Sequence, residues 1–302
     1  MRLRVTDLIA TARTQQEDGL ADLLLQWLHP NGTSVPPPPS PAPADLHGLV
    51  ATLQPRNRLA DLVLPEVVRQ ACEGVLEEHR QADLLRAHRL EPRHRILLSG
   101  LPGNGKTSLA EAIAEGLGVP FLVVLYTGVI GQSLSVTMAQ LRHLFDYAKA
   151  RRCVLFYDEF DTIGKERGDP HDTDTLKRAV GSLLVAIDAV PSSVVLIVAT
   201  NHLELLDRAV WRRFQVRLSL PKPDYAQVQE WCTRLQQQRG VPLSPGLIAM
   251  LADRLDGSSF AELEEVGNDI LRRWVLAGGA GDIEAIVSDR LDQRTKRFVS
   301  AY

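Results

Sequence analysis

The eight residues from Gly100 to Thr107 constrain this chain more than any other segment. They read Gly-Leu-Pro-Gly-Asn-Gly-Lys-Thr and fit the pattern G-x-x-x-x-G-K-[ST]. The apolar run Ile96 to Leu98 precedes them and a helical stretch follows, as expected of a phosphate-binding loop between a strand and a helix. In such a loop the backbone N–H groups converge on the phosphates, Lys106 reaches the β- and γ-phosphates, and the Thr107 hydroxyl ligates Mg²⁺. The segment therefore predicts a nucleotide site formed by Gly100, Pro102, Gly103, Asn104, Gly105, Lys106, Thr107 and Ser108.

The apolar pattern around this loop indicates the fold class. Apolar runs typical of buried strands alternate with helical patterns from residue 46 to about residue 220. Continuous apolar strands separated by helices predict a parallel sheet with helices on both faces, which is an α/β P-loop NTPase domain. After Pro221-Lys222-Pro223 the pattern is helical to the end of the chain, which predicts a small all-α domain over residues 221–302. The expected strands are Ile96–Leu98, Phe121–Leu125, Val154–Tyr157 and Val194–Ala199, and the expected helices are 228–235, 246–255, 261–276 and 283–298.

The first 45 residues differ from the rest of the chain. Residues 1–29 have the pattern of a short amphipathic helical segment, and residues 30–45 contain seven prolines. Such a proline content favours an extended spacer, although a proline run could also be a ligand for an SH3-type domain. We expect a tethered helical segment that contacts a partner or client.

Composition excludes several function classes. The 302 residues carry 34 basic and 37 acidic side chains, a net charge of −3, so the overall balance attracts neither nucleic acid nor an anionic membrane. The three cysteines show no spacing typical of zinc or redox sites. The sequence shows neither a secretory signal nor an apolar run long enough to span a membrane, which predicts a cytoplasmic protein.

Polar residues follow two of the expected strands. Asp158 and Glu159 come directly after Val154–Tyr157, and Asn201 follows the run that ends at Thr200. Next to a phosphate loop, Asp158 is suited to hold Mg²⁺ and Glu159 to polarise the water that attacks the γ-phosphate. Asn201 could orient that water. The alternatives without a catalytic role are that the two acids begin a solvated loop and that Asn201 is an ordinary turn residue.

Four motifs in this order carry a family resemblance. They are the phosphate loop, the Asp158-Glu159 strand end, Ala199-Thr200-Asn201, and residues 206–214, which read Leu-Asp-Arg-Ala-Val-Trp-Arg-Arg-Phe. Together they resemble an AAA-family ATPase module of the small, single-module bacterial type, over Leu62 to Leu276. The resemblance implies ATP and Mg²⁺ as cofactors, ATP hydrolysis in a hexamer or other ring, and a helical lid. It also makes Asn201 a sensor, and Arg212 and Arg213 arginine fingers that reach a neighbouring subunit's γ-phosphate.

Two segments depart from the family pattern. The lid segment 257–264 has Phe260 in place of the usual glycine, and Ala261 stands where related families place an arginine, so this position is expected to contribute backbone and packing. The segment that would line a ring's pore, 133–137, lacks the aromatic residue that grips a threaded polypeptide. Another loop that could face the same pore, residues 167–174, carries acidic residues and His171. Its composition favours a solvated loop.

These features leave three functions of unequal weight. Remodelling or activation of a protein partner, with peptidases among the partners that the resemblance implies, has the most support. A nucleotide-gated assembly switch that threads nothing is the alternative favoured by the missing aromatic. A DNA-associated loader is less favoured, because the sequence has only scattered basic pairs such as Arg151-Arg152.

Overall fold

The computed structural model describes residues 48–125, 134–161, 181, 183–206, 208–279 and 281–299, without the side chains of 134–138 and 295–299. The chain divides into two units, residues 1–40 and 41–302, and all described residues belong to the second. The expected N-terminal helical segment and the whole of the proline spacer, residues 30–45, lie outside the described residues. The same holds for Ser133 of the pore segment 133–137 and for the loop 167–174. The pore-segment backbone from Leu134 onward is the start of α7 (Leu134–Lys149).

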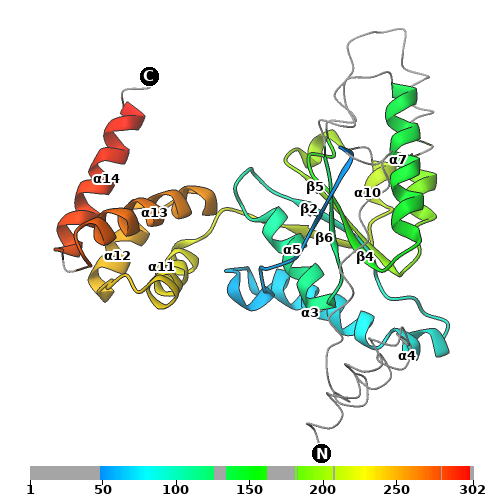
Figure 1. The fold of residues 1–302 in the computed structure, drawn as a ribbon, viewed down its shortest axis with the longest axis horizontal. Helices are drawn as coiled ribbons and strands as arrows, with labels where there is room; N and C mark the ends of the chain where they lie inside the picture. Colours follow the sequence, from blue (N-terminus) through cyan, green and yellow to red (C-terminus); the bar gives the residue numbers. More distant parts are fainter. Residues whose placement is uncertain are drawn as a thin grey trace, which may run out of the picture. The chain divides into compact units, whose positions relative to one another are not determined.

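The centre of the larger unit is a six-stranded sheet with the order β1-β3-β4-β5-β2-β6 (Figure 1). Its strands are short and mostly apolar. Five of them are parallel, and β1 pairs with β3 in the antiparallel sense at one edge. In chain order the strands are β1 (Val50–Leu53), β2 (Arg95–Ser99), β3 (Phe121–Val124), β4 (Cys153–Tyr157), β5 (Val194–Thr200) and β6 (Val216–Ser219).

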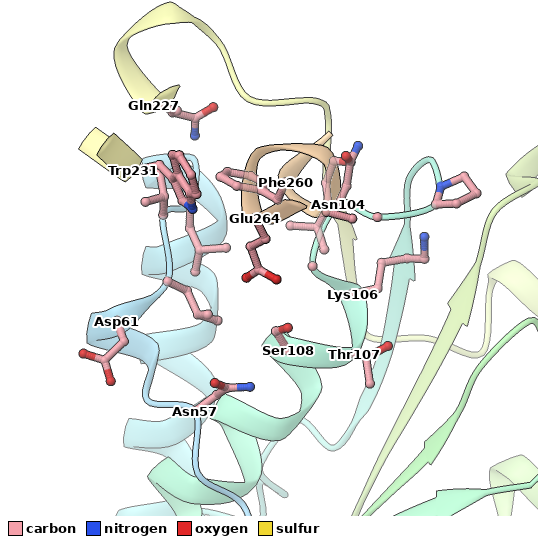
Figure 2. A pocket seen from close by; sticks show the side chains of 18 of the residues that line it. Asn57, Asp61, Asn104, Lys106, Thr107, Ser108, Gln227, Trp231, Phe260 and Glu264 are labelled. Atoms are coloured by element: carbon pink, nitrogen blue, oxygen red, sulfur yellow. The ribbon is translucent and has the colours of Figure 1, made fainter. Parts of the chain in front are cut away.

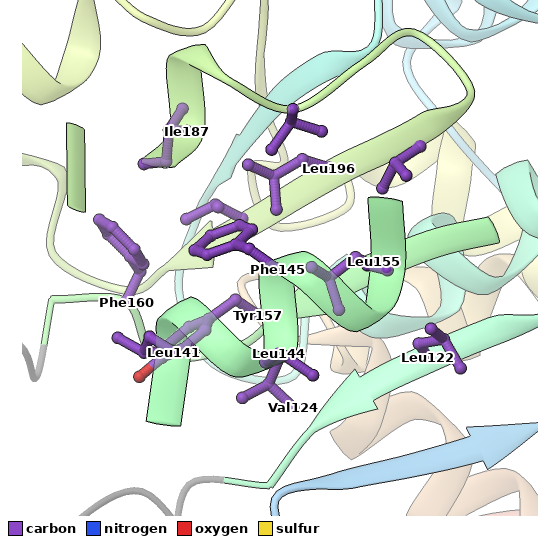
Figure 3. Packing of buried hydrophobic residues seen from close by; sticks show 14 of the residues in the cluster. Leu122, Val124, Leu141, Leu144, Phe145, Leu155, Tyr157, Phe160, Ile187 and Leu196 are labelled. Atoms are coloured by element: carbon purple, nitrogen blue, oxygen red, sulfur yellow. The ribbon is translucent and has the colours of Figure 1, made fainter. Parts of the chain in front are cut away.

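Helices cover both faces of the sheet, and β4 shows how the sequence achieves this. Alternate side chains of a strand point to opposite faces. Leu155 and Tyr157 belong to the core under α7, while Val154 and Phe156 belong to the core under α3 (Glu66–Arg80) and α5 (Lys106–Leu117). Figure 3 shows the first of these cores, in which Leu141, Leu144 and Phe145 of α7 pack over Leu155, Tyr157 and Leu196. All five β4 side chains are buried, so the strand reads as a continuous apolar run.

The C-terminal part of the chain is helical and has a third core of its own. Two of its helices begin with a reciprocal cap. Asp224 caps α11 together with Gln227, and Ser259 caps α13 together with Glu262. The Ser259 cap fixes the first residue of α13, and this position matters for the site described below. The helices are α11 (Tyr225–Arg239), α12 (Pro245–Arg254), α13 (Phe260–Leu276) and α14 (Ile283–Val299).

The fold class expected from the sequence is confirmed, with two additions. All four expected strands and all four expected C-terminal helices are present. The strands β1 and β6 were not expected. Both are edge strands of four residues, and β6 alternates buried and exposed side chains. Among the described helices none is long and apolar enough to cross a membrane.

Candidate functional site

A cavity of about 600 Å³ lies where three neighbouring parallel strands end. The phosphate loop follows β2, Asp158 follows β4, and Asn201 follows β5. The C-terminal helices α11 and α13 and the segment 57–65 complete its walls (Figure 2). Of the expected binding residues, Gly100 does not line the cavity itself. Those that do are Pro102, Gly103, Asn104, Gly105, Lys106, Thr107, Ser108, Asp158, Glu159, Asn201 and Ala261.

Lys106 is the most constrained polar side chain of this cavity. It is 7% exposed, and its Nζ donates to the carbonyls of Gly100 (2.7 Å) and Leu101 (3.0 Å) and to Asn201 Oδ1 (2.7 Å). Burial lowers the pKa of the Lys106 ammonium, while the negative charges of Asp158, Asp161 and Glu159 oppose this shift. The three oxygen acceptors hold a cation at the first residue of α5, where an anion is also favoured by the helix N-terminus.

Thr107 and Asp158 form a pair of oxygen ligands beside Lys106. The Thr107 hydroxyl lies 3.4 Å from Asp158 Oδ2. The other Asp158 oxygen accepts a hydrogen bond from the Glu159 N–H at 2.9 Å, so the carboxylate is fixed from its own strand end. A hydroxyl and a carboxylate are the ligands that Mg²⁺ prefers, and the donor set therefore fits this ion.

Glu159 has an unusual backbone conformation. Its φ is +51°, in the left-handed region that residues other than glycine seldom adopt. The N–H of the next residue, Phe160, again donates a hydrogen bond to the sheet, to Ala199 O of β5 at 2.9 Å. The chain therefore turns sharply at Glu159 and places this exposed carboxylate at the cavity wall.

A buried polar contact joins the ends of β4 and β5. The Thr200 hydroxyl donates to Asp161 Oδ1 at 3.0 Å and accepts from the His202 N–H at 3.0 Å. Thr200 and Asp161 are both buried. This contact fixes the backbone on either side of Asn201, and so it positions the amide that meets Lys106.

The phosphate loop also touches the helical part of the chain directly. Ala261 N–H donates to Gly103 O at 3.0 Å, and Asn104 Nδ2 donates to Leu220 O at 3.2 Å. Leu220 is the last residue before the Pro221-Lys222-Pro223 connection. A Cβ on Gly103 would lie 2.9 Å from Ala261 Cβ, so only glycine permits this approach. At position 261 the chain contributes a backbone contact.

Replacing Gly100 by Ala is expected to destabilise the fold. A Cβ at Gly100 would lie 2.3 Å from the Leu220 carbonyl oxygen, and its φ of +152° is itself unfavourable for alanine. Overpacking and backbone strain together predict a loss of about 2 to 4 kcal/mol, seen as a lower urea midpoint. The matched control is Gly246→Ala in α12, where the nearest atom is 3.9 Å away. Equal midpoints for the two variants would contradict the tight approach.

Arg212 and Arg213 lie away from the cavity of their own chain. They precede β6, whose Val216 pairs with Ile96 near the start of β2, whereas the phosphate loop follows the other end of β2. The strand length between Ile96 and Gly100 corresponds to about 13 Å. Arg213 forms an ion pair with Asp188 (2.8 Å), which also pairs with Arg95 (3.0 Å). The exposed Arg212 side chain makes no hydrogen bond or ion pair within the described part of the chain.

Sequence reasoning missed several residues that line the cavity. They come from the segment that leads to α3 and from the C-terminal helices, and they include Asn57, Asp61, Gln227, Trp231 and Glu264. The only signal available was the family resemblance, which assigns a lid but not the side chains that this lid presents. Among the described residues no group of three or more His, Cys, Asp or Glu side chains could hold a metal ion.

A phosphate loop at the end of a parallel sheet, with a helical lid in contact with it, defines the class of P-loop nucleoside triphosphatases. The family model described as "ATPase family associated with various cellular activities (AAA)" matches residues 96–222. The chain is 34% identical over 236 residues to an uncharacterized AAA family ATPase, y4kL, of Sinorhizobium fredii, covering 78% of this chain and 71% of the relative. The chain belongs to the AAA family of ATPases, as its motifs predicted, and it hydrolyses ATP.

Other relatives are much longer than this chain. The ATP-dependent zinc metalloprotease FtsH 3 of Sphaerobacter thermophilus is 34% identical over 66% of this chain, which spans 41% of the relative. The cell division cycle protein 48 homolog of Archaeoglobus fulgidus is 32% identical over 79% of this chain, which spans 34% of it. The fold is similar to the crystal structure of the FIGL-1 AAA domain, with a TM-score of 0.63 at 20% identity, over 81% of this chain and 85% of that one.

Proposed function

We propose that ATP binds in the cavity between the phosphate loop and the helical lid and is hydrolysed there with Mg²⁺. The observation that carries this proposal is the position of Lys106, whose buried ammonium is held at the N-terminus of α5 by oxygen atoms that phosphate oxygens can replace. Thr107 and Asp158 would hold Mg²⁺, which neutralises charge on the β- and γ-phosphates. Lid residues lie on the opposite wall of the cavity and shield the phosphates from solvent.

Glu159 and Asn201 are the residues proposed to act on the attacking water. Glu159 is an exposed carboxylate at the cavity wall and accepts the proton of that water as the bond to the γ-phosphate forms. Asn201 already meets Lys106 through its Oδ1, so its amide lies where the γ-phosphate is held. Its placement is supported by the buried contact between Thr200 and Asp161.

Catalysis is proposed to be completed by a neighbouring subunit in a hexamer or other ring. Arg212 is exposed and precedes β6, at the end of the strands opposite to the end that carries its own phosphate loop, so it can serve a second chain's site but not its own. A guanidinium that approaches the γ-phosphate stabilises the charge that develops during transfer. Arg213, held by Asp188, is proposed to fix the backbone from which Arg212 projects.

The work coupled to hydrolysis is proposed to be remodelling or activation of a protein partner. One kind of relative supports a protein target, since it is named a metalloprotease and contains a module similar to this chain. A separate peptidase is one candidate partner, because that relative is named a protease. The alternative is a nucleotide-gated assembly switch, which is favoured by the missing aromatic residue in the segment 133–137. Three buried, unpaired cysteines fit a reducing cytoplasm.

Light scattering on the Glu159→Gln variant tests the ring. With ATP and Mg²⁺ the mass is expected to rise from that of a small species to about six protomers, because a ligand bound between subunits stabilises the assembly. Without nucleotide, or with EDTA, the mass should stay low. A variant that binds ATP but remains a monomer at every concentration would contradict a self-assembled ring and favour a partner protein that supplies the missing arginine.

A further inference from the structure

Another cavity lies at the opposite end of the parallel strands from the nucleotide cavity. It has a volume of about 430 Å³ and is formed where β4 and β5 begin, beside the end of α3 and the short helix α4 (Ala82–Ala87) that follows it (Figure 1). Cys153, the first residue of β4, lines this cavity, whereas Asp158 of the nucleotide cavity follows the last residue of β4. The strand between them corresponds to about 16 Å. No residue that the structure describes lines both cavities, so a ligand here would not compete directly with a nucleotide.

Arginine side chains dominate the polar wall of this cavity. Arg80 comes from the end of α3, Arg86 from α4, and Arg152 from the segment directly before β4. Asp83 is the one acidic residue among the described residues that line the cavity. The lining thus carries three guanidinium groups and one carboxylate, a balance that favours an anionic ligand.

Two of these arginines are free to bind a ligand. The exposed Arg152 side chain makes no hydrogen bond or ion pair with the part of the chain that the structure describes. Arg80 is paired with Glu77 at 3.8 Å, and both side chains are more than half exposed, so this pair contributes little and can be exchanged for a ligand. The half-buried Ser193, which also lines the cavity, has a hydroxyl without a hydrogen bond among the described residues.

The third arginine, Arg86, is held in place at the cavity wall. It donates to Ser192 Oγ at 3.3 Å, and it pairs with Asp83 at 3.3 Å and with Glu91 at 3.4 Å. Ser192 in turn donates to Glu91 Oε2 at 2.6 Å. These contacts fix the segment before β5 against α4. The wall is therefore formed before a ligand arrives, which lowers the entropy cost of binding.

The arginines suit a dianion better than a single carboxylate. A phosphoryl group carries close to two negative charges and three strong acceptor oxygens, and an arginine cluster can satisfy several of these oxygens at once. The cavity volume is in the range of sites for small organic ligands and far exceeds that of a phosphate ion. Leu117, Val119 and Val195 also line it and offer an apolar surface to the group that bears the phosphate.

We propose that this cavity binds a phosphate monoester, with Arg152 and Arg80 as ligands of the phosphoryl group and the apolar lining in contact with the organic part. The same chemistry is presented by a small phosphate ester and by a phosphorylated side chain of a protein. The proposal is independent of ATP hydrolysis, because none of its residues lines the nucleotide cavity.

The test is calorimetry with O-phosphoserine on the full chain carrying Lys106→Ala, which removes the ammonium group of the phosphate loop and so suppresses binding there. Adding Arg152→Ala should weaken binding by about 10- to 150-fold, the range for loss of a hydrogen bond to a charged group. Arg152→Lys keeps the charge without the planar fork and should give an intermediate affinity. The same effect of Arg152→Ala is expected with native Lys106, and this is the measurement to use if Lys106→Ala unfolds the chain.

Arg142→Ala on α7 provides the matched control. Arg142 is also exposed and has no ion pair within the described part of the chain, and α7 covers the other face of the sheet. This variant should bind O-phosphoserine as the parent chain does. The proposal is overturned if O-phosphoserine does not bind at millimolar concentration, or if Arg152→Ala binds it as well as Arg142→Ala does.

A short phosphoserine peptide identifies the source of the phosphate. Tighter binding of the peptide than of O-phosphoserine would assign the site to a phosphorylated protein segment, and equal affinities would assign it to a small phosphate ester. Both results support the site only if serine and the unphosphorylated peptide do not bind. Equal binding of the phosphorylated and unphosphorylated peptides would contradict recognition of a phosphoryl group.

Discussion

Replacing Glu159 by Gln is expected to lower the rate of ATP hydrolysis by about two to four orders of magnitude, the usual contribution of a general base. ATP affinity should change little, because Lys106, Thr107 and Asp158 remain in place. Glutamine has the same length and meets the same left-handed backbone as the native residue at this position, so the variant removes the carboxylate and little else. Phosphate release and nucleotide binding would be measured on the same preparation.

The control for this substitution is Glu73→Gln on the exposed face of α3. It makes the same chemical change outside the cavity and should hydrolyse ATP at the native rate. If Glu159→Gln hydrolyses ATP as fast as Glu73→Gln does, Glu159 is not the base and another group must accept the proton.

The Arg212→Ala variant is expected to lose about three orders of magnitude or more in hydrolysis, the magnitude seen when an arginine finger is removed. Binding of ATP by the isolated chain should persist, because Arg212 does not line its own cavity. Arg213→Ala should have the smaller effect on hydrolysis, since Arg213 is engaged by Asp188 at 2.8 Å. Steady-state phosphate release from the two variants at equal concentration would rank them.

Mixing two inactive variants tests whether Arg212 acts on a neighbour. A subunit carrying Arg212→Ala keeps Glu159, and a subunit carrying Glu159→Gln keeps Arg212. Where the two meet in the right order, one complete site forms, so activity should reappear in the mixture. An equal mixture that assembles and yet shows no recovery would place the missing arginine on the same chain as the ATP or assign its role to another residue.

Much of the fold could be predicted because its signals are local. The loop from Gly100 to Thr107 carries its own spacing, and strands buried on both faces, such as β4, read as continuous apolar runs. The edge strands were not predicted, and the reason is physical. In β6 only alternate residues are buried, and four residues of alternation are too few to distinguish from a loop.

The site was predictable only where side chains follow a strand end. Asp158 and Asn201 could be placed in this way, because neighbouring parallel strands end at one edge of the sheet. The ion pair between Arg213 and Asp188 could not, since it depends on how a distant helix packs. For Trp231 the helical pattern does not distinguish an aromatic residue buried in a core from one that forms a cavity wall.

The contacts of the phosphate loop with the lid have a consequence for how the nucleotide state is sensed. The Gly103 carbonyl accepts a hydrogen bond from Ala261 at the start of α13, and the Asn104 side-chain amide donates one to Leu220, the residue before the connection to the lid. If the peptide planes of the loop rotate when a phosphate departs, the two lid contacts, at Ala261 and at Leu220, must shift together. The lid can then respond to the loss of phosphate through these two hydrogen bonds, without a charged residue of its own at position 261.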